Sequence, residues 1–268
     1  MHPWLLTLPN GTQLPSWGFV VTSTIIVLGL VGHRMATREG LPKDTAMDVI
    51  LIIFGGHLIG GRFGYVRANW HKFEDDPGKI FDLTQGGTAI IEAFLLITVL
   101  FFLYLWRKRL HLMQVADIAV PLVAIGQGLG RVGCLAAGCC HGHETDVPWA
   151  IVFTHPESRA PLNVPLHPTQ VYEMVFGFAI GALLLWMRPR RTHYGVVAHW
   201  FLILWSISRF VLEFFRGDAK RGWFMEDTLG ELLSIPQALC IFLLAWGIAG
   251  VVGFSRLAIC KIPDGQIK

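Results

Sequence analysis

The chain has 268 residues, of which 53% are hydrophobic and 15% charged, and its formal net charge is +3. Soluble domains carry roughly 25% charged residues, so this composition excludes an ordinary soluble protein and indicates a membrane protein. The basic residues form short clusters between apolar runs, which argues against nucleic-acid binding. Apolar runs use up nearly the whole chain, so we expect a single transmembrane domain over residues 1–268.

Windows of about 19 residues predict seven transmembrane helices. They cover residues 17–33, 48–66, 88–106, 114–129, 171–187, 195–215 and 235–254. The predicted fold class is therefore all-α, a polytopic membrane protein with seven transmembrane helices and a structured outer loop. That loop covers about residues 130–170, and its five prolines argue against a helix.

Charge in the connecting segments predicts the orientation. Three lysines or arginines lie in each of four short segments on one side, 34–47, 107–113, 188–194 and 255–268. The segments on the other side mix basic residues with aspartate and glutamate. By the positive-inside rule, the N-terminus lies outside and the C-terminus lies in the cytoplasm.

The second predicted helix carries Gly56, Gly60 and Gly64, a spacing of four residues. This small-xxx-small pattern lets helix backbones approach closely in lipid, and we predict helix packing for it. The same helix carries His57, Arg62 and Tyr65, which could line an interior cavity.

A glycine-rich stretch from Gly126 to Gly142 contains Arg131. An arginine at bilayer depth costs about 3 kcal/mol on insertion scales, so it normally faces a cavity and has a partner. We favour contact with a substrate phosphate; a structural ion pair and exposure at the membrane interface are the alternatives. The glycines formally match G-x-G-x-x-G, but no strand precedes them, so we do not predict a dinucleotide site.

Arg209, Glu213 and Arg216 are spaced four and three residues apart, which places them on one stripe of a helix. We predict that the two arginines share the glutamate and leave positive charge for an anionic ligand. Arginine suits phosphate because its planar fork donates two parallel hydrogen bonds and keeps its proton. The alternative is an Arg209–Glu213 ion pair that only fixes packing.

A cluster of five residues at the end of the glycine-rich stretch has the side chains of a metal site: Cys134, Cys139, Cys140, His141 and His143. Its spacing contains neither C-x-x-C nor H-x₃₋₅-H, the usual zinc patterns. We therefore predict small packing residues, with a metal site and a reactive thiol as alternatives, and we predict no metal and no cofactor.

His167 precedes a proline at the start of the fifth predicted helix. A base or ligand and a structural histidine are equally good interpretations. Thr169 is predicted to cap that helix, with Glu173 one residue beyond the capping-box spacing.

Several segments in chain order together resemble the prolipoprotein diacylglyceryl transferases. They are Leu14–Gly18, Gly60–Val66, Asp76-Pro77 ahead of Gly86-Gly87, Gly130-Arg131-Val132-Gly133 through Gly142, His167-Pro168-Thr169-Gln170-Val171-Tyr172-Glu173, Arg209-Phe210-Val211-Leu212-Glu213-Phe214-Phe215-Arg216 and Leu233–Gln237. The set covers most of the chain.

The resemblance implies an enzyme of the bacterial inner membrane with seven spans and an external N-terminus. Such enzymes move the diacylglyceryl group of phosphatidylglycerol onto the lipobox cysteine thiol of a prolipoprotein and release glycerol phosphate. The partners implied are phosphatidylglycerol, prolipoprotein signal peptides with a lipobox cysteine, and the lipid bilayer. The catalytic residues implied are Arg131, Arg209 and Glu213, and the substrate-binding residues implied are Arg131, Arg216, Arg62, Gly142, His167 and Gln170.

The chain also departs from the family pattern. Ile91 occupies the place of a family histidine, and Trp17, Cys134, Cys139 and Leu166 replace polar residues. The residue that acts as general base is therefore open among four histidines, His57, His141, His143 and His167. A divergent transferase with another phospholipid or acceptor thiol, and a non-catalytic membrane protein that binds lipid or lipoprotein, are the alternative functions.

Overall fold

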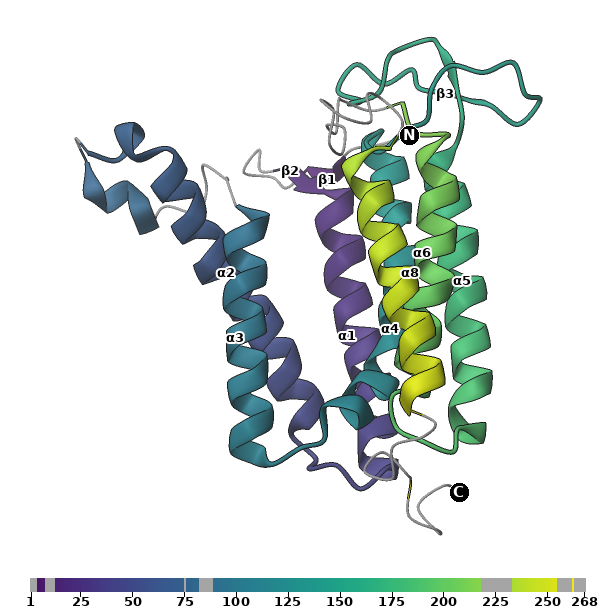
Figure 1. Cartoon of the computed structure of the whole chain (residues 1–268). Coiled ribbons are helices and arrows are strands. Elements are labelled where there is room, and N and C mark those ends of the chain that lie inside the picture. The colour runs from purple at the N-terminus through teal and green to yellow at the C-terminus, as the bar shows by residue number, and fades with distance from the viewer. Residues whose placement is uncertain are drawn as a thin grey trace. The chain divides into compact units, whose positions relative to one another are not determined.

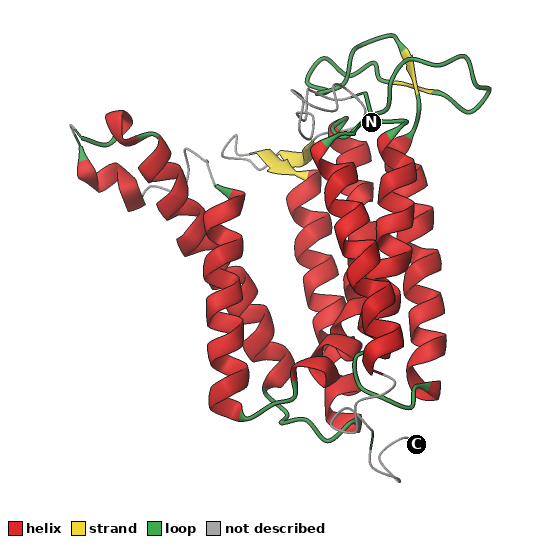
Figure 2. Cartoon of the chain, in the orientation of Figure 1, coloured by secondary structure: helices red, strands yellow, loops and turns green. Residues whose placement is uncertain are grey.

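The structure is a computed structural model that describes residues 4–7, 13–74, 76–81, 89–217, 233–254 and 262. Helices dominate it (Figure 2): α1 (Ser16–Arg38), α2 (Thr45–Ala68), α3 (Ile90–Lys108), α4 (Leu112–Ala137), α5 (Thr169–Met187), α6 (Val196–Glu213) and α8 (Ile235–Phe254). Three short 3₁₀ helices accompany them, η1 (Trp70–Lys72), η2 (Pro77–Phe81) and η3 (Arg188–Arg190). The described residues also form two antiparallel strand pairs, β1 (Trp4–Thr7) with β2 (Gln13–Pro15) and β3 (Ile151–Val152) with β4 (Pro165–Leu166).

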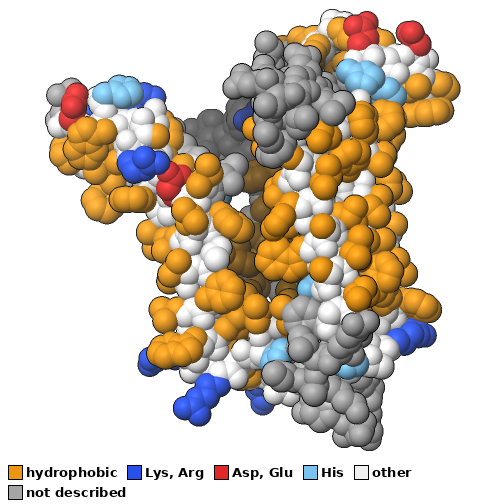
Figure 3. Space-filling model, viewed as in Figure 1, with side chains coloured by type: hydrophobic (Ala, Val, Ile, Leu, Met, Phe, Trp, Pro, Cys, Tyr) orange, Lys and Arg blue, Asp and Glu red, His pale blue; other side chains and the backbone are white. Residues whose placement is uncertain are grey.

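The prediction of a helical membrane protein is confirmed. Among the described residues, six helices are long and apolar enough to cross a membrane: α1, α2, α4, α5, α6 and α8. Helix α3 is not one of the six and carries Glu92, Arg107 and Lys108. Hydrophobic side chains line the flanks of the helices, as Figure 3 shows. Such flanks suit contact with lipid tails, because many of their large hydrophobic side chains are exposed.

The chain divides into two compact units, residues 29–112 and residues 1–28 with 113–268. In the first, α2 packs on α3 through the predicted glycines. A Cβ added at Gly56, Gly60 or Gly64 would lie 2.5–2.8 Å from atoms of α3. No side chain fits at those distances, so the prediction of close helix packing is confirmed.

The second unit is a bundle in which α5, α6 and α8 lie side by side (Figure 1). Its core contains Ala124, Ile180, Leu184 and Val197, from α4, α5 and α6. Buried Asp117 of α4 accepts hydrogen bonds of 2.9 Å from the backbone N–H groups of Gly195 and Ala198, two of the unpaired donors at the start of α6. These contacts fix the register of α4, α5 and α6, which carry the candidate site.

Helix α4 is longer than predicted. The expected span ended at residue 129 and the loop began at 130, but the helix continues to Ala137. The glycines remain helical because neighbours pack on them: an added Cβ would lie 3.1 Å from Phe178 at Gly128 and 2.9 Å from Trp17 at Gly133. Residues 130–137 are therefore helix and not loop.

The chain leaves α4 through a tight reversal at Gly138, whose φ is +70°. The Gly138 N–H donates to the Leu135 carbonyl at 3.4 Å, and the Cys139 N–H donates to the Cys134 carbonyl at 3.1 Å. This pair of bonds is a Schellman motif, which satisfies the last carbonyls of the helix and favours glycine at its left-handed position. It folds Cys139 back over Cys134.

Residues 138–168 form a loop with a small hydrophobic cluster of its own, made by Phe153, Ala160 and Leu166. The loop is ordered by this cluster and by the β3–β4 pair. Its place on the outer side of a membrane stays a prediction.

Candidate functional site at the end of helix α4

Three backbone segments meet at Gly142. Its N–H donates to the His167 carbonyl at 3.0 Å, and the next N–H, of His143, donates to the Phe215 carbonyl at 3.1 Å. Gly142 also forms an antiparallel bridge with Arg216. A Cβ at position 142 would lie 2.4 Å from His167 Cβ and 2.6 Å from the Phe215 carbonyl oxygen. Only glycine fits there, and it brings the end of α6 next to the start of α5.

One carboxylate in this region holds two arginines. Glu173, in the first turns of α5, lies 2.5 Å from Arg131 Nε through Oε2 and 2.8 Å from Arg216 Nη1 through Oε1. The side chains of Glu173 and Arg216 are 9% and 5% exposed, and that of Arg131 is 27% exposed. From the sequence, Glu173 is predicted only to lie one residue beyond the capping-box spacing, and its position within the resembling motif is the one signal that points to a role in the site.

The prediction that Arg209 and Arg216 share Glu213 is therefore wrong in part. Arg209 Nη2 lies 2.7 Å from Glu213 Oε2 within α6, as its spacing predicted. Helix α6 ends at Glu213, and the turn through Phe214 and Phe215 takes Arg216 off the helical stripe. Arg216 then points to Glu173 instead.

Arg209 keeps donor capacity for a ligand. Its Nη1 atom is buried and has no hydrogen-bond partner among the residues that the structure describes. Glu213 is fixed by a further contact, since Ser234 Oγ donates to its Oε1 at 3.4 Å. The carboxylate therefore orients the arginine while one edge of the guanidinium stays available.

Arg131 and Arg209 line the same cavity. It has a volume of about 30 Å³ and is bounded also by Gln127, Glu173, Trp205 and Ser208. That volume holds about one or two waters and not a lipid headgroup. A phosphate can enter only if side chains move, and both predicted catalytic arginines are at hand to receive it.

Thr169 and Gln170 fasten the loop to α5. Thr169 Oγ1 donates to the Cys140 carbonyl at 2.7 Å, and Gln170 Nε2 donates to the Cys139 carbonyl at 2.8 Å. The predicted capping role of Thr169 is wrong, because it is already inside the helix and Pro168 occupies the N-cap position. Gln170 is fully buried, and its Oε1 has no partner within the described part of the chain.

His167 sits in an aromatic cluster. Its Nδ1 lies 3.2 Å from the Tyr172 hydroxyl, and its ring packs on Phe215 and His143 with centroids 5.2 and 4.8 Å away. Burial, and to a smaller degree the charge of His143, lowers the pKa of His167. The imidazole is therefore neutral at pH 7, as a general base must be, but its contacts equally suit a structural role.

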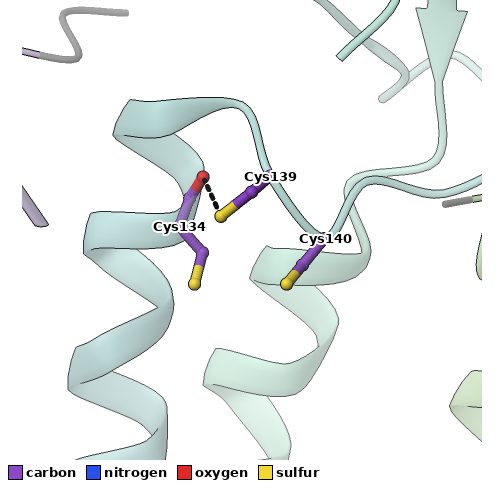
Figure 4. Close-up of side chains that lie close together, drawn as sticks. All are labelled: Cys134, Cys139 and Cys140. Carbon is purple, nitrogen blue, oxygen red and sulfur yellow. Dashed lines mark hydrogen bonds between the residues drawn. The ribbon is translucent and has the colours of Figure 1, made fainter. Parts of the chain in front are cut away.

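The sulfur atoms of Cys134, Cys139 and Cys140 lie within 4.8 Å of one another. Figure 4 shows Cys139 and Cys140 entering this cluster from the loop and Cys134 from α4. The Cys139 thiol donates to the Cys134 carbonyl at 3.8 Å, and Arg131 Nη1 lies 3.7 Å from Cys134 Sγ. Hydrogen bonds from Cys134 and Cys139, and a weaker one from Arg216, lower the pKa of the Cys140 thiol. The prediction of small packing residues stays untested, but linear spacing gave no sign that the three thiols meet, because the reversal at Gly138 brings them together.

The two histidines of that sequence cluster point elsewhere. His141 Nδ1 lies 3.0 Å from the Gly142 carbonyl oxygen, and His143 Nδ1 lies 2.9 Å from the Glu144 carbonyl oxygen. Neither ring belongs to the group of three thiols.

Arg62 belongs to the unit of residues 29–112 and is described there by itself. Its guanidinium donates to the carbonyls of Ile80 and Lys79 at 2.8 and 2.7 Å and lies over the rings of Tyr65 and Phe73. Its role in substrate binding stays a prediction. In the same unit Ile91 is 73% exposed, whereas the glycine pair at 86 and 87 lies outside the described residues.

Comparison with known proteins identifies relatives over nearly the whole chain. The family model described as prolipoprotein diacylglyceryl transferase matches residues 3–252. A phosphatidylglycerol–prolipoprotein diacylglyceryl transferase 2 of Clostridium perfringens is 33% identical over 89% of this chain and 90% of its own length. Enzymes of that name, without the number, are 34% identical in Chromohalobacter salexigens, over 85% of both chains, and 34% identical in Geobacter sulfurreducens, over 83% of this chain and 86% of theirs.

Proposed function

The chain belongs to the prolipoprotein diacylglyceryl transferase family, and we propose that it transfers the diacylglyceryl group of phosphatidylglycerol to the lipobox cysteine thiol of prolipoproteins. The observation that carries this proposal is the cavity shared by Arg131 and Arg209, two cations from different helices. It is the arrangement that a leaving phosphate ester requires.

The reaction replaces a carbon–oxygen bond by a carbon–sulfur bond. The acceptor sulfur, as thiolate, attacks the glyceride carbon that bears the phosphate oxygen. The carbon–oxygen bond breaks, and glycerol phosphate departs with the electron pair. Negative charge therefore grows on the phosphate in the transition state, and preorganised donors near it lower the barrier.

Arg209 provides such a donor directly, through the buried Nη1, which has no hydrogen-bond partner among the described residues. Arg131 uses Nε on Glu173 and Nη1 on Cys134, fewer than its five N–H donors. In this role Glu213 orients Arg209, and Glu173 orients Arg131 and Arg216. Gly142, His167 and Gln170 shape the site through backbone crossings and buried contacts, next to the position of the substrate.

Family membership and the charges of the connecting segments support a placement in the membrane. We propose an inner-membrane enzyme with α3 as the seventh span, the N-terminus outside and the C-terminus in the cytoplasm. The basic η3 segment then lies on the cytoplasmic side, as the positive-inside rule requires. The loop 138–168, at the opposite ends of α4 and α5, then faces the outer side, where prolipoprotein signal peptides emerge.

The test is turnover by purified protein in detergent with phosphatidylglycerol and a peptide containing a lipobox cysteine. Wild type should release glycerol phosphate, and Arg131→Ala and Arg209→Ala should each lower the rate about 10²–10³-fold, the loss expected for one oxyanion donor. Arg190→Ala is the matched control, since Arg190 is exposed and contacts Trp186. Unchanged rates in both site variants would refute the assigned roles. No release by wild type from any anionic phospholipid would favour a non-catalytic lipid-binding protein.

A further inference from the structure

The three clustered thiols have no role in the proposed reaction so far. Cys134 is buried, Cys139 and Cys140 are partly buried, and no disulfide joins them in the described chain. Backbone contacts hold the cluster from both sides: the reversal at Gly138 fixes Cys139, and Thr169 holds the Cys140 carbonyl. Three converging sulfurs on a fixed backbone form a preorganised ligand set for a thiophilic ion.

The distances fit zinc. Zinc–sulfur bonds are about 2.3 Å long, so thiolates around one tetrahedral ion lie about 3.8 Å apart. The three Sγ atoms already lie within 4.8 Å of one another. Rotation of the side chains that moves the sulfur atoms by about 1 Å or less brings them to zinc-binding distances without any change in the backbone.

The surrounding charge fits as well. Three thiolates on Zn²⁺ carry a net charge of −1. Arg131 Nη1 lies 3.7 Å from Cys134 Sγ. Guanidinium groups stabilise thiolates and offset the negative charge of such a centre.

The set leaves one coordination position open. No fourth ligand from the described chain joins the three thiols. Zinc with three protein ligands and an open position is the pattern of catalytic sites, whereas structural sites are closed by four. A pocket of about 620 Å³ borders two of the three thiol residues, Cys139 and Cys140, together with His141, Arg159, Ala160, Pro161 and Gly217.

We propose that Cys134, Cys139 and Cys140 bind Zn²⁺, and that its open position takes the acceptor thiol of the lipobox peptide. This inference rests on the proposed function. Ile91 stands where the resemblance places a family histidine, and a thiol bound to zinc needs no histidine as base because the metal itself displaces the proton.

The step balances without a redox partner. The peptide thiol replaces a zinc-bound water, and its proton passes to solvent. The sulfur then forms the carbon–sulfur bond while glycerol phosphate leaves with the electron pair of the broken carbon–oxygen bond. The thioether that results is neutral and a weak zinc ligand, so the product can leave. Arg131 contacts the thiol cluster and lines the phosphate cavity, so nucleophile and leaving group meet at one side chain.

The first measurement is the zinc content of the purified full-length protein by elemental analysis. We expect about one zinc per chain, and about none after Cys134→Ala, Cys139→Ala or Cys140→Ala. Cys240→Ala is the matched control, since Cys240 is buried in α8 and is not in the cluster. Circular dichroism separates loss of zinc from loss of fold. A protein without zinc in the wild type after reconstitution, or with zinc retained in all three variants, overturns the proposal.

The second measurement tests the acceptor. With Co²⁺ in place of zinc, three thiolates give sulfur-to-metal charge transfer in the near ultraviolet, and the lipobox peptide should raise its intensity by about one third, as a fourth thiolate binds. A peptide with serine at the lipobox position should not. If the cysteine peptide leaves the intensity of the cobalt charge-transfer band unchanged, the metal is structural and the acceptor role is refuted.

Failure of this inference is distinguishable from failure of the proposed function. Full glycerol phosphate release by a zinc-free protein would overturn the zinc site and leave the transferase intact. A cobalt site that responds to the peptide in a protein without turnover would retain the site and remove the reaction.

Discussion

Replacing Glu173 by glutamine removes the negative charge that both Arg131 and Arg216 contact. The shape of the side chain and one acceptor oxygen remain. The local charge of the three groups changes from +1 to +2, in a place where Glu173 and Arg216 are nearly buried. The perturbation is therefore electrostatic and not steric.

The magnitude follows from the geometry. Charges about 4 Å apart attract by about 4 kcal/mol at an effective dielectric constant of 20. Breaking a buried pair by removing one partner costs about 3–5 kcal/mol. The retained hydrogen bond and the partial exposure of Arg131 favour the lower value, about 3 kcal/mol, which corresponds to a Tm lower by roughly 6–12 °C.

The assay is thermal unfolding in detergent, with Glu144→Gln in the exposed loop as control. Glu173→Gln should lower Tm as above, and the second change Arg216→Gln should restore part of it, because it removes the surplus charge. Such a double-mutant cycle should give a coupling of about 1–3 kcal/mol. Glycerol phosphate release should fall at least about tenfold, because a displaced Arg131 no longer meets the phosphate. A Tm for Glu173→Gln equal to that of Glu144→Gln would refute the argument that one carboxylate organises the two arginines.

Two further predictions concern Gly142, where three segments meet, and the protonation of His167. Gly142→Ala should destabilise the protein by about 3 kcal/mol or more and abolish glycerol phosphate release, since the added methyl group meets backbone and side-chain atoms at 2.4–2.7 Å on two sides. The control is Gly130→Ala, because a Cβ added at Gly130 meets nothing within 4 Å. Equal Tm values for the two variants would contradict the close crossing of segments at Gly142. Because burial lowers the folded pKa of His167, the unfolded chain binds the proton more tightly, so stability should be full above the unfolded pKa of about 6.5 and fall as the pH drops below it. His167→Gln should reduce the fall of Tm below about pH 6.5. If the variant loses as much Tm at low pH as the wild type, another group causes the loss.

The positions of the helices could be predicted from the sequence, but the contacts between the helices could not. Each predicted span overlaps a helix, because lipid leaves the backbone no other way to satisfy its polar groups. The stripe of Arg209 and Glu213 was predictable for the same reason, since helical spacing alone sets their distance. The partner of Arg216 could not be predicted in this way, because the position of Arg216 depends on where α6 ends.

Contacts between helices lay beyond sequence spacing. Glu173 meets Arg131 only because α5 packs against α4 through the glycines at 128 and 177. The thiol cluster depends on two left-handed residues, Gly138, which reverses the chain, and Cys140, which has a φ of +60°. Spacing rules for metal ligands count residues along the chain and do not register such a reversal.

The ion pair between Arg131 and Glu173 also sets an order of events during synthesis. Arg131 leaves the ribosome about forty residues, or roughly 2–8 s, before Glu173 at typical rates of translation. Throughout that interval the arginine lacks Glu173, its partner in the folded chain, so we expect helix α4 to reach its final depth only when α5 arrives. We therefore expect α4 and α5 to insert together. Helix α4 then stays beside the translocation machinery until α5 supplies Glu173, which pairs with the charge of Arg131.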